Sequence, residues 1–531
     1  MQKSVGIFGC LGHKDHFSHY SFPYSFQDWA FLSTEPYNHF SAPSIYENNK
    51  LYVAIDGDVI ADIAPTTTPA EFIAHHFLQD GNLNFLQHLD GMFSVCLLEK
   101  DIKRAHLATS PLGLSPLYIW TGAGSLGFAS SLHHLYHLLK EKPSIDANAL
   151  KEYLAIGHMG IDNTWFQECY RLPPATVLSW SYQNGVDKKV TYWHWPEQLP
   201  DLSGPDYRAY LHLLTEALND AILRHTTPSD SIHISLSGGL DSRALLASAK
   251  TVNPDITIQC TTFGMEGCDD ITIAKQVAGL AQVDLAVVHV SDNNWPHHLY
   301  QAVLDCDGES PFIHLAASKI RPANTLVNLD GYCGDALLGG GYLRSDPTLE
   351  YRFQTRGLRF ILNGPRAMRR HFQPRLCFFD KRFFELYARI PNKLLADSKI
   401  YKDMLLHGYK DFYGDIPWKD TGRPIGAPPP SNKLPHRILR KLKNKAFPKK
   451  ELPMLDWCRW LNNPLFKQNA RDILNADDAI LKDFVRTSPL ETSLEFHNPQ
   501  DVEIAARYVT AEGWLQLTVR NDTRLKEIFS T

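Results

Sequence analysis

The segment Ser237-Gly-Gly-Leu-Asp-Ser242 carries the residue types and spacing of a phosphate-binding turn. A short apolar run ends at Leu236, and an Ala/Leu-rich segment, Arg243 to Lys250, follows, so we predict a strand, a glycine turn and a helix. Paired glycines let the backbone approach a ligand closely, and N–H groups at the turn and at the start of the helix attract anions. The serine hydroxyls add donors, and Asp241 can hold Mg²⁺ against phosphate oxygens. The alternative is an ordinary strand-to-helix turn with incidental serine and aspartate.

The hexapeptide resembles the S-G-G-x-D-S pyrophosphate loop of enzymes that split ATP into AMP and pyrophosphate, among them the asparagine synthetase family. It lacks the lysine of a G-x-x-x-x-G-K-[ST] loop, so the γ-phosphate is not its obvious target. Further segments resemble blocks of the same family in the same order: Val5 to Gly9, Leu89 to Phe93, Thr261 to Asp269, Asp330 to Gly340 and Arg375 to Asp380. The resemblance covers most of the chain.

This resemblance implies an α/β protein with two domains. Residues 1–200 would form an αββα glutaminase-like (Ntn-hydrolase-like) domain, and residues 201–531 an adenine-nucleotide α-hydrolase-like parallel-sheet domain with a helical extension. A chain of 531 residues is long enough for more than one core.

The residue pattern agrees with this division. Residues 1–190 are rich in strand-type runs, such as those at 51–55 and 92–98, with short helices predicted at 69–78 and 147–155. Proline and glycine gather at 195–205, a long helix is predicted at 207–224, and strands and helices then alternate from 231 to 290. Such alternation indicates a parallel sheet, whose ligands bind beyond the carboxyl ends of its strands. Residues beyond 345 have a mostly helical pattern.

By resemblance, a set of residues in the second half would bind ATP and Mg²⁺. The nucleotide would contact Leu236, Ser237, Gly238, Gly239, Asp241, Ser242, Phe263 and Gly331, and Asp241 and Asp335 would carry the metal ion. Adenylation of a carboxylate needs such a site, because the charge on the phosphates must be neutralised as pyrophosphate leaves. The alternative for Asp335 is a loop acid that caps a helix.

Tyr332 stands where asparagine synthetase has the glutamate of S-G-E-G, and Ala336 replaces the following acid. A tyrosine here resembles the β-lactam synthetase branch, in which the substrate's own amine attacks its own adenylate. The tyrosine would accept the proton that the amine loses, but its pKa near 10 requires a partner or nearby cations. The branch supplies a glutamate about thirty residues later, where this chain has Arg366, and we assign no partner. Alternatively, Tyr332 only packs against the substrate.

The family also places a lysine after R-x-P-F-L-D that stabilises charge on the reacting phosphate or on the oxyanion that follows. Lys399 and Lys402 are the candidates here. The alternative is that both are surface lysines on a helix.

The first half lacks the residue that a glutaminase of this family requires. Its cysteine must be the first residue of the mature chain, because the terminal amine activates the thiol. Val5 occupies that place, and Cys10 lies on the wrong side of the motif. The family's N-G-E segment is Asp56-Gly-Asp58 here, whereas Asp90 matches the acid that takes the amino group of glutamine. We therefore predict no glutamine hydrolysis and a role as a packing partner or docking surface.

Composition excludes several other classes. The net charge of −5 favours neither nucleic acid nor an acidic tail. Nine cysteines without a repeated spacing predict neither a disulfide framework nor a zinc site. The start has no secretory pattern, and no apolar run approaches the roughly 20 residues that span a bilayer, so we expect a cytoplasmic protein without a membrane span.

The sequence thus favours an ATP-dependent amide-forming enzyme whose substrate is a small molecule or a peptide with a carboxylate and an amine. Among natural-product enzymes of this kind we slightly favour a macrolactam cyclase of lasso peptides, with a precursor peptide and a processing protease as partners. The alternative is an ammonia-dependent or partner-fed asparagine synthetase, and a non-enzymatic scaffold is the least favoured. The basic run Lys433 to Lys450 could bind a peptide, a partner or an anionic surface, or form only a solvated helix.

Overall fold

The computed structural model describes most of the chain. The described residues are 6–18, 22–36, 43–61, 63–64, 66–199, 201, 203–227, 229, 231–321, 327–338, 348–428, 452–485 and 496–529, with the backbone alone at 336 and 337. Val5 and the basic run Lys433 to Lys450 lie outside them.

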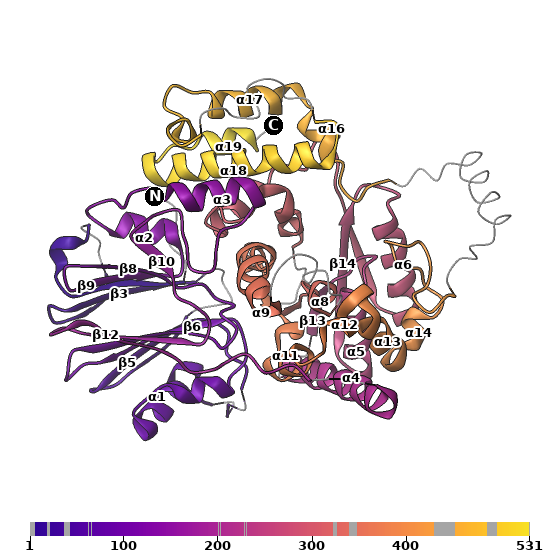
Figure 1. Cartoon of the computed structure of the whole chain (residues 1–531), viewed down its shortest axis with the longest axis horizontal. Coiled ribbons are helices and arrows are strands. Elements are labelled where there is room, and N and C mark those ends of the chain that lie inside the picture. The colour runs from indigo at the N-terminus through magenta and orange to yellow at the C-terminus, as the bar shows by residue number, and fades with distance from the viewer. Residues whose placement is uncertain are drawn as a thin grey trace.

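The N-terminal half, residues 6–199, is built on two antiparallel sheets that pack face to face (Figure 1). The first has the order β10-β8-β9-β1-β3-β2, with β1 Gly6–Leu11, β2 Tyr24–Phe26, β3 Ala30–Glu35, β8 Tyr118–Gly122, β9 Ser125–Ala129 and β10 Cys169–Arg171. The second has the order β12-β11-β7-β6-β5-β4, with β4 Ser44–Glu47, β5 Leu51–Gly57, β6 Phe93–Glu99, β7 Arg104–Thr109, β11 Thr176–Ser181 and β12 Gly185–Thr191. Apolar side chains from both inner faces, such as Ile7, Tyr52 and Trp180, form the core between them.

Helices cover the outer faces of both sheets. Helix α1 (Pro69–Asp80) packs on the second sheet, and α2 (Leu132–Leu138) and α3 (Ala147–Ile156) lie on the side of the first. The first helix begins where the sequence signals it, because Thr68 caps the amide of Glu71 and Pro69 takes the first helical position. The layers are therefore αββα, as predicted.

The C-terminal half, residues 203–529, contains a parallel five-stranded sheet with the order β15-β14-β13-β16-β17. Its strands are β13 Ser231–Ser235, β14 Thr257–Gly264, β15 Asp284–His289, β16 Val327–Leu329 and β17 Gln373–Arg375. The helices that pack with it are α4 Gly204–Thr226, α5 Asp241–Val252 and α6 Asp269–Ala281. The predicted α/β fold class is confirmed, and the elements from 204 to 289 lie within a few residues of their predicted positions.

The rest of this half is mainly helical. Between β15 and β17 lie α7 Leu299–Asp305, the 3₁₀ helix η3 Phe312–Lys319, α8 Gly334–Leu338, α9 Leu349–Arg352, a π-helical segment Phe353–Ile361 and α10 Asn363–Met368. After β17 come a 3₁₀ turn Cys377–Phe379, α11 Lys381–Ala388, α12 Asn392–Leu395, α13 Lys399–Gly408 and α14 Lys410–Tyr413. The described chain ends with α16 Trp457–Leu461, α17 Pro464–Leu474, the 3₁₀ helix η8 Ile480–Asp483, α18 Pro499–Arg520 and α19 Arg524–Ile528.

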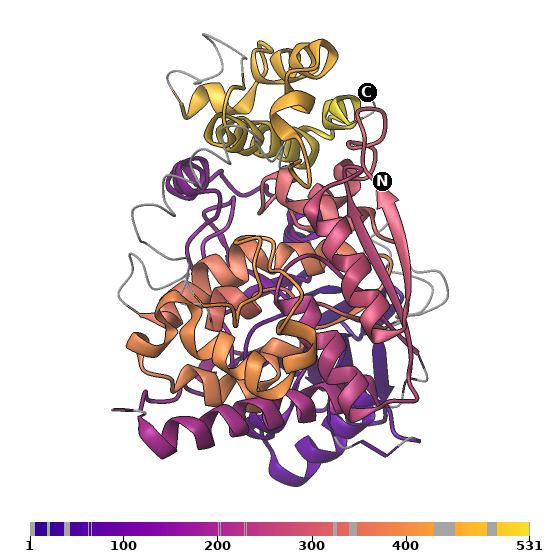
Figure 2. The same ribbon diagram turned by 90° about the vertical axis from the view of Figure 1, so that its right-hand side faces the viewer.

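The helices near the end of the described chain pack against the N-terminal half. In Figures 1 and 2, α18 lies beside α3 at the top of the molecule, and one hydrophobic cluster contains Tyr153, Trp165 and Trp514. The rings of Trp165 and Trp514 stack with their centroids 5.6 Å apart. The two halves therefore share a core, and the domain boundary between residues 200 and 201 stays a prediction. None of the described helices combines the length and apolar character needed to cross a bilayer.

Candidate nucleotide and metal site

The two loops singled out in the sequence meet at the carboxyl edge of the parallel sheet. Strand β13 leads into the loop 236–240, and its neighbour β16, paired through Ile234 and Leu329, leads into the loop 330–333. A Cβ atom at Gly331 would lie 2.8 Å from the amide nitrogen of Ser242. Glycine at this position thus allows the second loop to touch the first turn of α5.

The serine hydroxyls of the glycine loop are bonded within the loop. The amide of Ser237 donates to Oγ of Ser242 over 3.1 Å, and the amide of Gly239 donates to Oγ of Ser237 over the same distance. The amide of Gly238 donates to Oδ1 of Asp270, in the first turn of α6, over 3.1 Å. These donors lie next to the start of α5, and a phosphate group bound there would replace the hydrogen bonds they now make within the protein.

Asp241 and Asp335 lie side by side, as a shared metal ion requires. Oδ2 of Asp241 accepts a hydrogen bond from the amide of Asp335 over 2.9 Å, and Oδ1 accepts one from the hydroxyl of Tyr401 over 2.6 Å. Burial and the neighbouring charge of Asp335 raise the pKa of Asp241 well above its usual value. A bound cation would relieve this penalty, and carboxylate oxygens suit Mg²⁺. No three His, Cys, Asp or Glu side chains gather as a complete cage within the described ranges, so phosphate oxygens and water would complete the coordination.

A cation that the sequence did not reveal lies beside the glycine loop. The ammonium of Lys419 is 3.1 Å from Oδ1 of Asp270, the atom that also holds Gly238, and the amide of Lys419 donates to the carbonyl of Gly238 over 3.3 Å. Its side chain is 36% exposed, so the ammonium can exchange Asp270 for a ligand. No spacing in the sequence links Lys419 to the loop, because the two come together only through the fold.

The two predicted lysines make their contacts elsewhere. Lys399 pairs with Asp403 over 2.6 Å, and Lys402 donates to the carbonyl of Asp397 over 2.9 Å. Neither ammonium makes a hydrogen bond or ion pair with residues 236–242 in the described structure. The side chain of α13 that reaches the site is Tyr401, through Asp241. A catalytic role for Lys399 or Lys402 stays a prediction without a contact to support it.

Leu236 and Phe263 occupy the strand ends that flank the loop. Leu236 is buried in the core and its amide donates to the carbonyl of Thr261 over 2.9 Å. Phe263 is half-buried near the end of β14. Both positions suit a nucleotide at this edge, and their contacts with one remain predictions.

Tyr332 lies in the second loop with its phenol against α10. Its amide donates to Oδ1 of Asp330 over 2.9 Å, and a Cβ atom at Gly364 would lie 2.4 Å from its hydroxyl oxygen. Burial, followed by the charge of Asp330, raises the pKa of Tyr332. The next residue, Cys333, has a φ of 75°, which non-glycine residues rarely adopt. No hydrogen bond joins the Tyr332 hydroxyl to another described residue. A protonated phenol can donate a hydrogen bond, but it must lose its own proton before it can act as a strong base.

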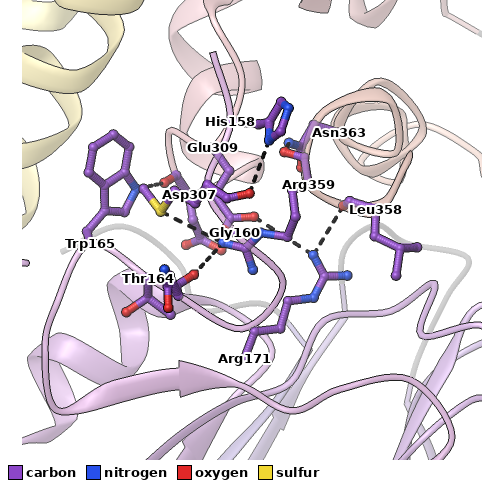
Figure 3. Close-up of polar contacts among 12 residues, drawn as sticks. His158, Gly160, Thr164, Trp165, Arg171, Asp307, Glu309, Leu358, Arg359 and Asn363 are labelled. Atoms are coloured by element: carbon purple, nitrogen blue, oxygen red, sulfur yellow. Dashed lines mark hydrogen bonds and ion pairs between the residues drawn. The ribbon is translucent and has the colours of Figure 1, made fainter. Parts of the chain in front are cut away.

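Arg366, at the position where the resemblance led us to look for a glutamate, belongs to a buried ion network. Figure 3 shows its partners Asp307 and Glu309 together with Arg359 and Arg171. It pairs with Asp307 over 2.9 Å and with Glu309 over 3.2 Å, and Glu309 also pairs with Arg359 over 2.8 Å. Arg171 of the N-terminal half lies 4.0 Å from Glu309 and donates to the carbonyl of Leu358. The network therefore joins the two halves through Arg171, and Arg366 supplies no base to Tyr332.

The acids at the glutaminase-like positions pair with arginines of the other half. Asp56 pairs with Arg369 over 2.9 Å, Asp58 with Arg375 over 2.5 Å, and Asp90 with Arg224 over 2.8 Å. A cavity of about 10 Å³ lies beside one of these acids, Asp58, and its lining also includes Gly91, His225 and Arg375. It has space for about one water molecule.

Comparisons with known proteins agree with this geometry. The profile of the glutamine amidotransferase domain matches residues 44–193, and that of asparagine synthase matches residues 213–364. A solved B. subtilis glutamine phosphoribosylpyrophosphate (PRPP) amidotransferase, complexed with ADP and GMP, covers 62% of this chain and 76% of its own at 11% identity, with a TM-score of 0.22, which is too low to support an argument.

Several similar proteins are named asparagine synthetase. Asparagine synthetase (glutamine-hydrolyzing) 1 of Bacillus subtilis is 23% identical over 265 residues, which are 49% of this chain and 41% of that protein. Asparagine synthetase (glutamine-hydrolyzing) of Brassica oleracea is 25% identical over 337 residues, 58% of this chain and 48% of that protein. The chain thus spans less than half the length of these relatives. The two matching domains, in this order and with these relatives, make the chain a member of the asparagine synthetase family.

Proposed function

We propose that this protein forms amide bonds by ATP-dependent adenylation of a carboxylate. The observation that carries the proposal is the contact between the Ser237–Ser242 loop and the loop of Asp335, which brings anion donors and two carboxylates to one sheet edge. The match to asparagine synthase over residues 213–364 supports the same reaction class.

The first step is attack of a substrate carboxylate oxygen on the α-phosphorus of ATP, with release of pyrophosphate. The backbone N–H groups and serine hydroxyls of residues 237–242 would hold the phosphates. The ammonium of Lys419 would leave Asp270 and pair with the negative charge that builds up on the phosphates. Mg²⁺, when bound to Asp241 and Asp335, would neutralise phosphate charge. In the second step an amine nitrogen attacks the acyl carbon, AMP leaves, and the amine gives up a proton.

The nitrogen in this proposal comes from the substrate itself. Tyr332 replaces the glutamate of the related synthetases, and its neutral phenol would orient the incoming amine by a hydrogen bond before a proton is transferred. The product is then a lactam or a macrolactam. A lasso-peptide cyclase would fit, with a precursor peptide as substrate and its processing protease as a partner.

Glutamine is not the nitrogen source in this proposal. The three acids at the glutaminase-like positions pair with Arg369, Arg375 and Arg224. The cavity beside Asp58 is far smaller than a glutamine molecule. A second candidate, an ammonia-dependent or partner-fed asparagine synthetase, is favoured by the names of the relatives. A scaffold without activity is the least favoured, since the charge of Asp335 and the loss of solvent around Asp241 make the Asp241 carboxylate costly unless a cation is bound.

One assay tests these alternatives together. Purified protein with Mg·ATP would receive glutamine and aspartate, ammonium and aspartate, or short peptides that carry a free terminal amine and a side-chain carboxylate. We expect AMP and pyrophosphate only with the peptides, and no glutamate above background in any mixture. Asparagine in the ammonium mixture would favour the second candidate. Absence of both pyrophosphate release and Mg·ATP binding would refute the proposal.

Gly364→Ala should slow amide formation about a hundredfold while Mg·ATP binding is retained. The new methyl group would overlap the Tyr332 phenol, and a displacement of about 1 Å at a reacting group has an effect of this size. Gly279→Ala on α6 is the matched control, because its Cβ atom meets no other atom within 4 Å. Equal rates for the two variants would show that the position of Tyr332 does not matter.

A further inference from the structure

We propose that Asp58 and Asp90, the acids of the former glutamine pocket, now form a clamp that positions the Tyr332–Asp335 loop. The clamp acts through the segment 375–381, which it holds at both ends. The clamp would give the N-terminal half a positioning role in the reaction of the C-terminal half. Of the two measurements in its test, only Mg·ATP binding rests on the proposed function.

The two chain segments that carry the clamp acids are held against each other through their backbones. The amide of Ile60 donates to the carbonyl of Asp90 over 2.8 Å, and the amide of Asp90 donates back over 3.0 Å. Gly91 has a φ of 113°, and a Cβ atom there would lie 2.1 Å from the carbonyl oxygen of Asp58. Only glycine permits this approach, so the backbones of Asp58 and of Gly91, the residue after Asp90, stay in close contact.

Each carboxylate holds one end of the segment 375–381. Asp58 forms an ion pair of 2.5 Å with Nε of Arg375. Asp90 accepts the amide of Lys381 over 2.6 Å at the start of α11, and it also pairs with Arg224, which in turn pairs with Asp380. Both acids are largely buried, with 17% and 5% of their side chains exposed. Buried charged pairs hold a geometry more firmly than exposed ones, because losing a partner leaves a desolvated charge.

The clamped segment contacts the candidate site at two places. The carbonyl of Arg375 accepts the amide of Asp330, whose side chain accepts the amide of Tyr332. The ring of Phe378 lies 2.9 Å from the Cβ position of Gly334 and packs edge-on against Tyr401, with centroids 6.3 Å apart.

The Tyr332–Asp335 loop contains a residue whose backbone conformation needs support from its surroundings. Cys333 occupies the left-handed region, and such a conformation persists only where the surroundings impose it. Tyr401 in turn donates to Asp241 over 2.6 Å, so the clamp reaches both the amine side and the metal side of the site.

The test compares local exchange with nucleotide affinity in the full chain. Asp58→Asn should speed amide hydrogen exchange of peptides from residues 327–338 about tenfold, with β6 unchanged, and should weaken Mg·ATP binding about tenfold by calorimetry. Arg375→Met removes the same ion pair from the other side, and the double variant should be no worse than either single one. Asp28→Asn, which removes an exposed partner of Lys103 in the same half, is the control and should change neither readout.

Three outcomes would overturn the clamp: unchanged exchange at 327–338, a uniform rise across the N-terminal half, or additive effects of Asp58→Asn and Arg375→Met. Failure of the unmodified protein to bind Mg·ATP would refute the proposed function instead, and the exchange data alone would then decide the clamp.

Discussion

Asp241→Asn should lower ATP-dependent pyrophosphate release about a thousandfold. A neutral amide holds Mg²⁺ more weakly than a carboxylate does, so the charge on the phosphates would no longer be neutralised. Asparagine has nearly the same shape, and its carbonyl can still accept one of the two hydrogen bonds, from Tyr401 or from the amide of Asp335. The expected loss is therefore one of charge. Release would be measured with the substrate that the three mixtures of the activity assay identify, and Mg²⁺-dependent ATP binding by calorimetry.

The folded state of this variant should not be weakened. Burial and Asp335 raise the pKa of Asp241, and a raised carboxyl pKa means that the charged form costs stability above that pKa. Removal of the charge should leave the melting temperature equal or higher at neutral pH. Asp255→Asn, at an exposed position beyond the end of α5, is the matched control. Full turnover by Asp241→Asn would refute the assignment of this site.

Arg366→Met should reduce the free energy of unfolding by about 3–5 kcal/mol, the usual cost of removing one partner from a buried ion pair. The change leaves Asp307 and Glu309 with fewer cations in the network of Figure 3. Methionine has a similar length and fills much of the same space. Urea denaturation would measure the loss, and Arg104→Met, which removes an exposed partner of Asp187, should change stability by less than about 1 kcal/mol.

The loss should be smaller at pH 5 than at pH 8. Burial raises the pKa of Asp307, and Arg366 opposes that rise. Without Arg366 the pKa rises further, so the folded state takes up a proton more readily than the unfolded chain does, and the variant regains stability as the pH falls. A loss that is equal at both pH values would show that the charge of Asp307 is not the cause.

Local signals explain why much of the site could be predicted from the sequence. The loop Ser237–Ser242 depends on paired glycines and on the adjoining strand and helix, all within one short segment. Helix α3 likewise has its start at the cap Asp146 and its end at Gly157 in the left-handed region. Such features require no knowledge of distant residues.

Interactions between distant segments could not be predicted in the same way. Lys419 reaches Asp270 across 149 positions of the chain, and we chose Lys399 and Lys402 because only nearness to a matched block could guide the choice. Tyr401, between them, reaches Asp241 because α13 packs against α4 and α8 with that side chain inward. The helix was expected, but its inward-facing residue was not.

The sequence alone determined that this chain has a paired-glycine loop at a strand end, an altered third element with Tyr332, and, in its first half, acids at the glutaminase-like positions with Val5 where the family has its cysteine. Only the tertiary structure decided what those acids do, since Asp58 meets Arg375 and Asp90 meets Arg224 across the two halves. The reason is physical: a turn or a cap is set by neighbours in the chain, whereas an ion pair depends on which strands and helices become neighbours in space.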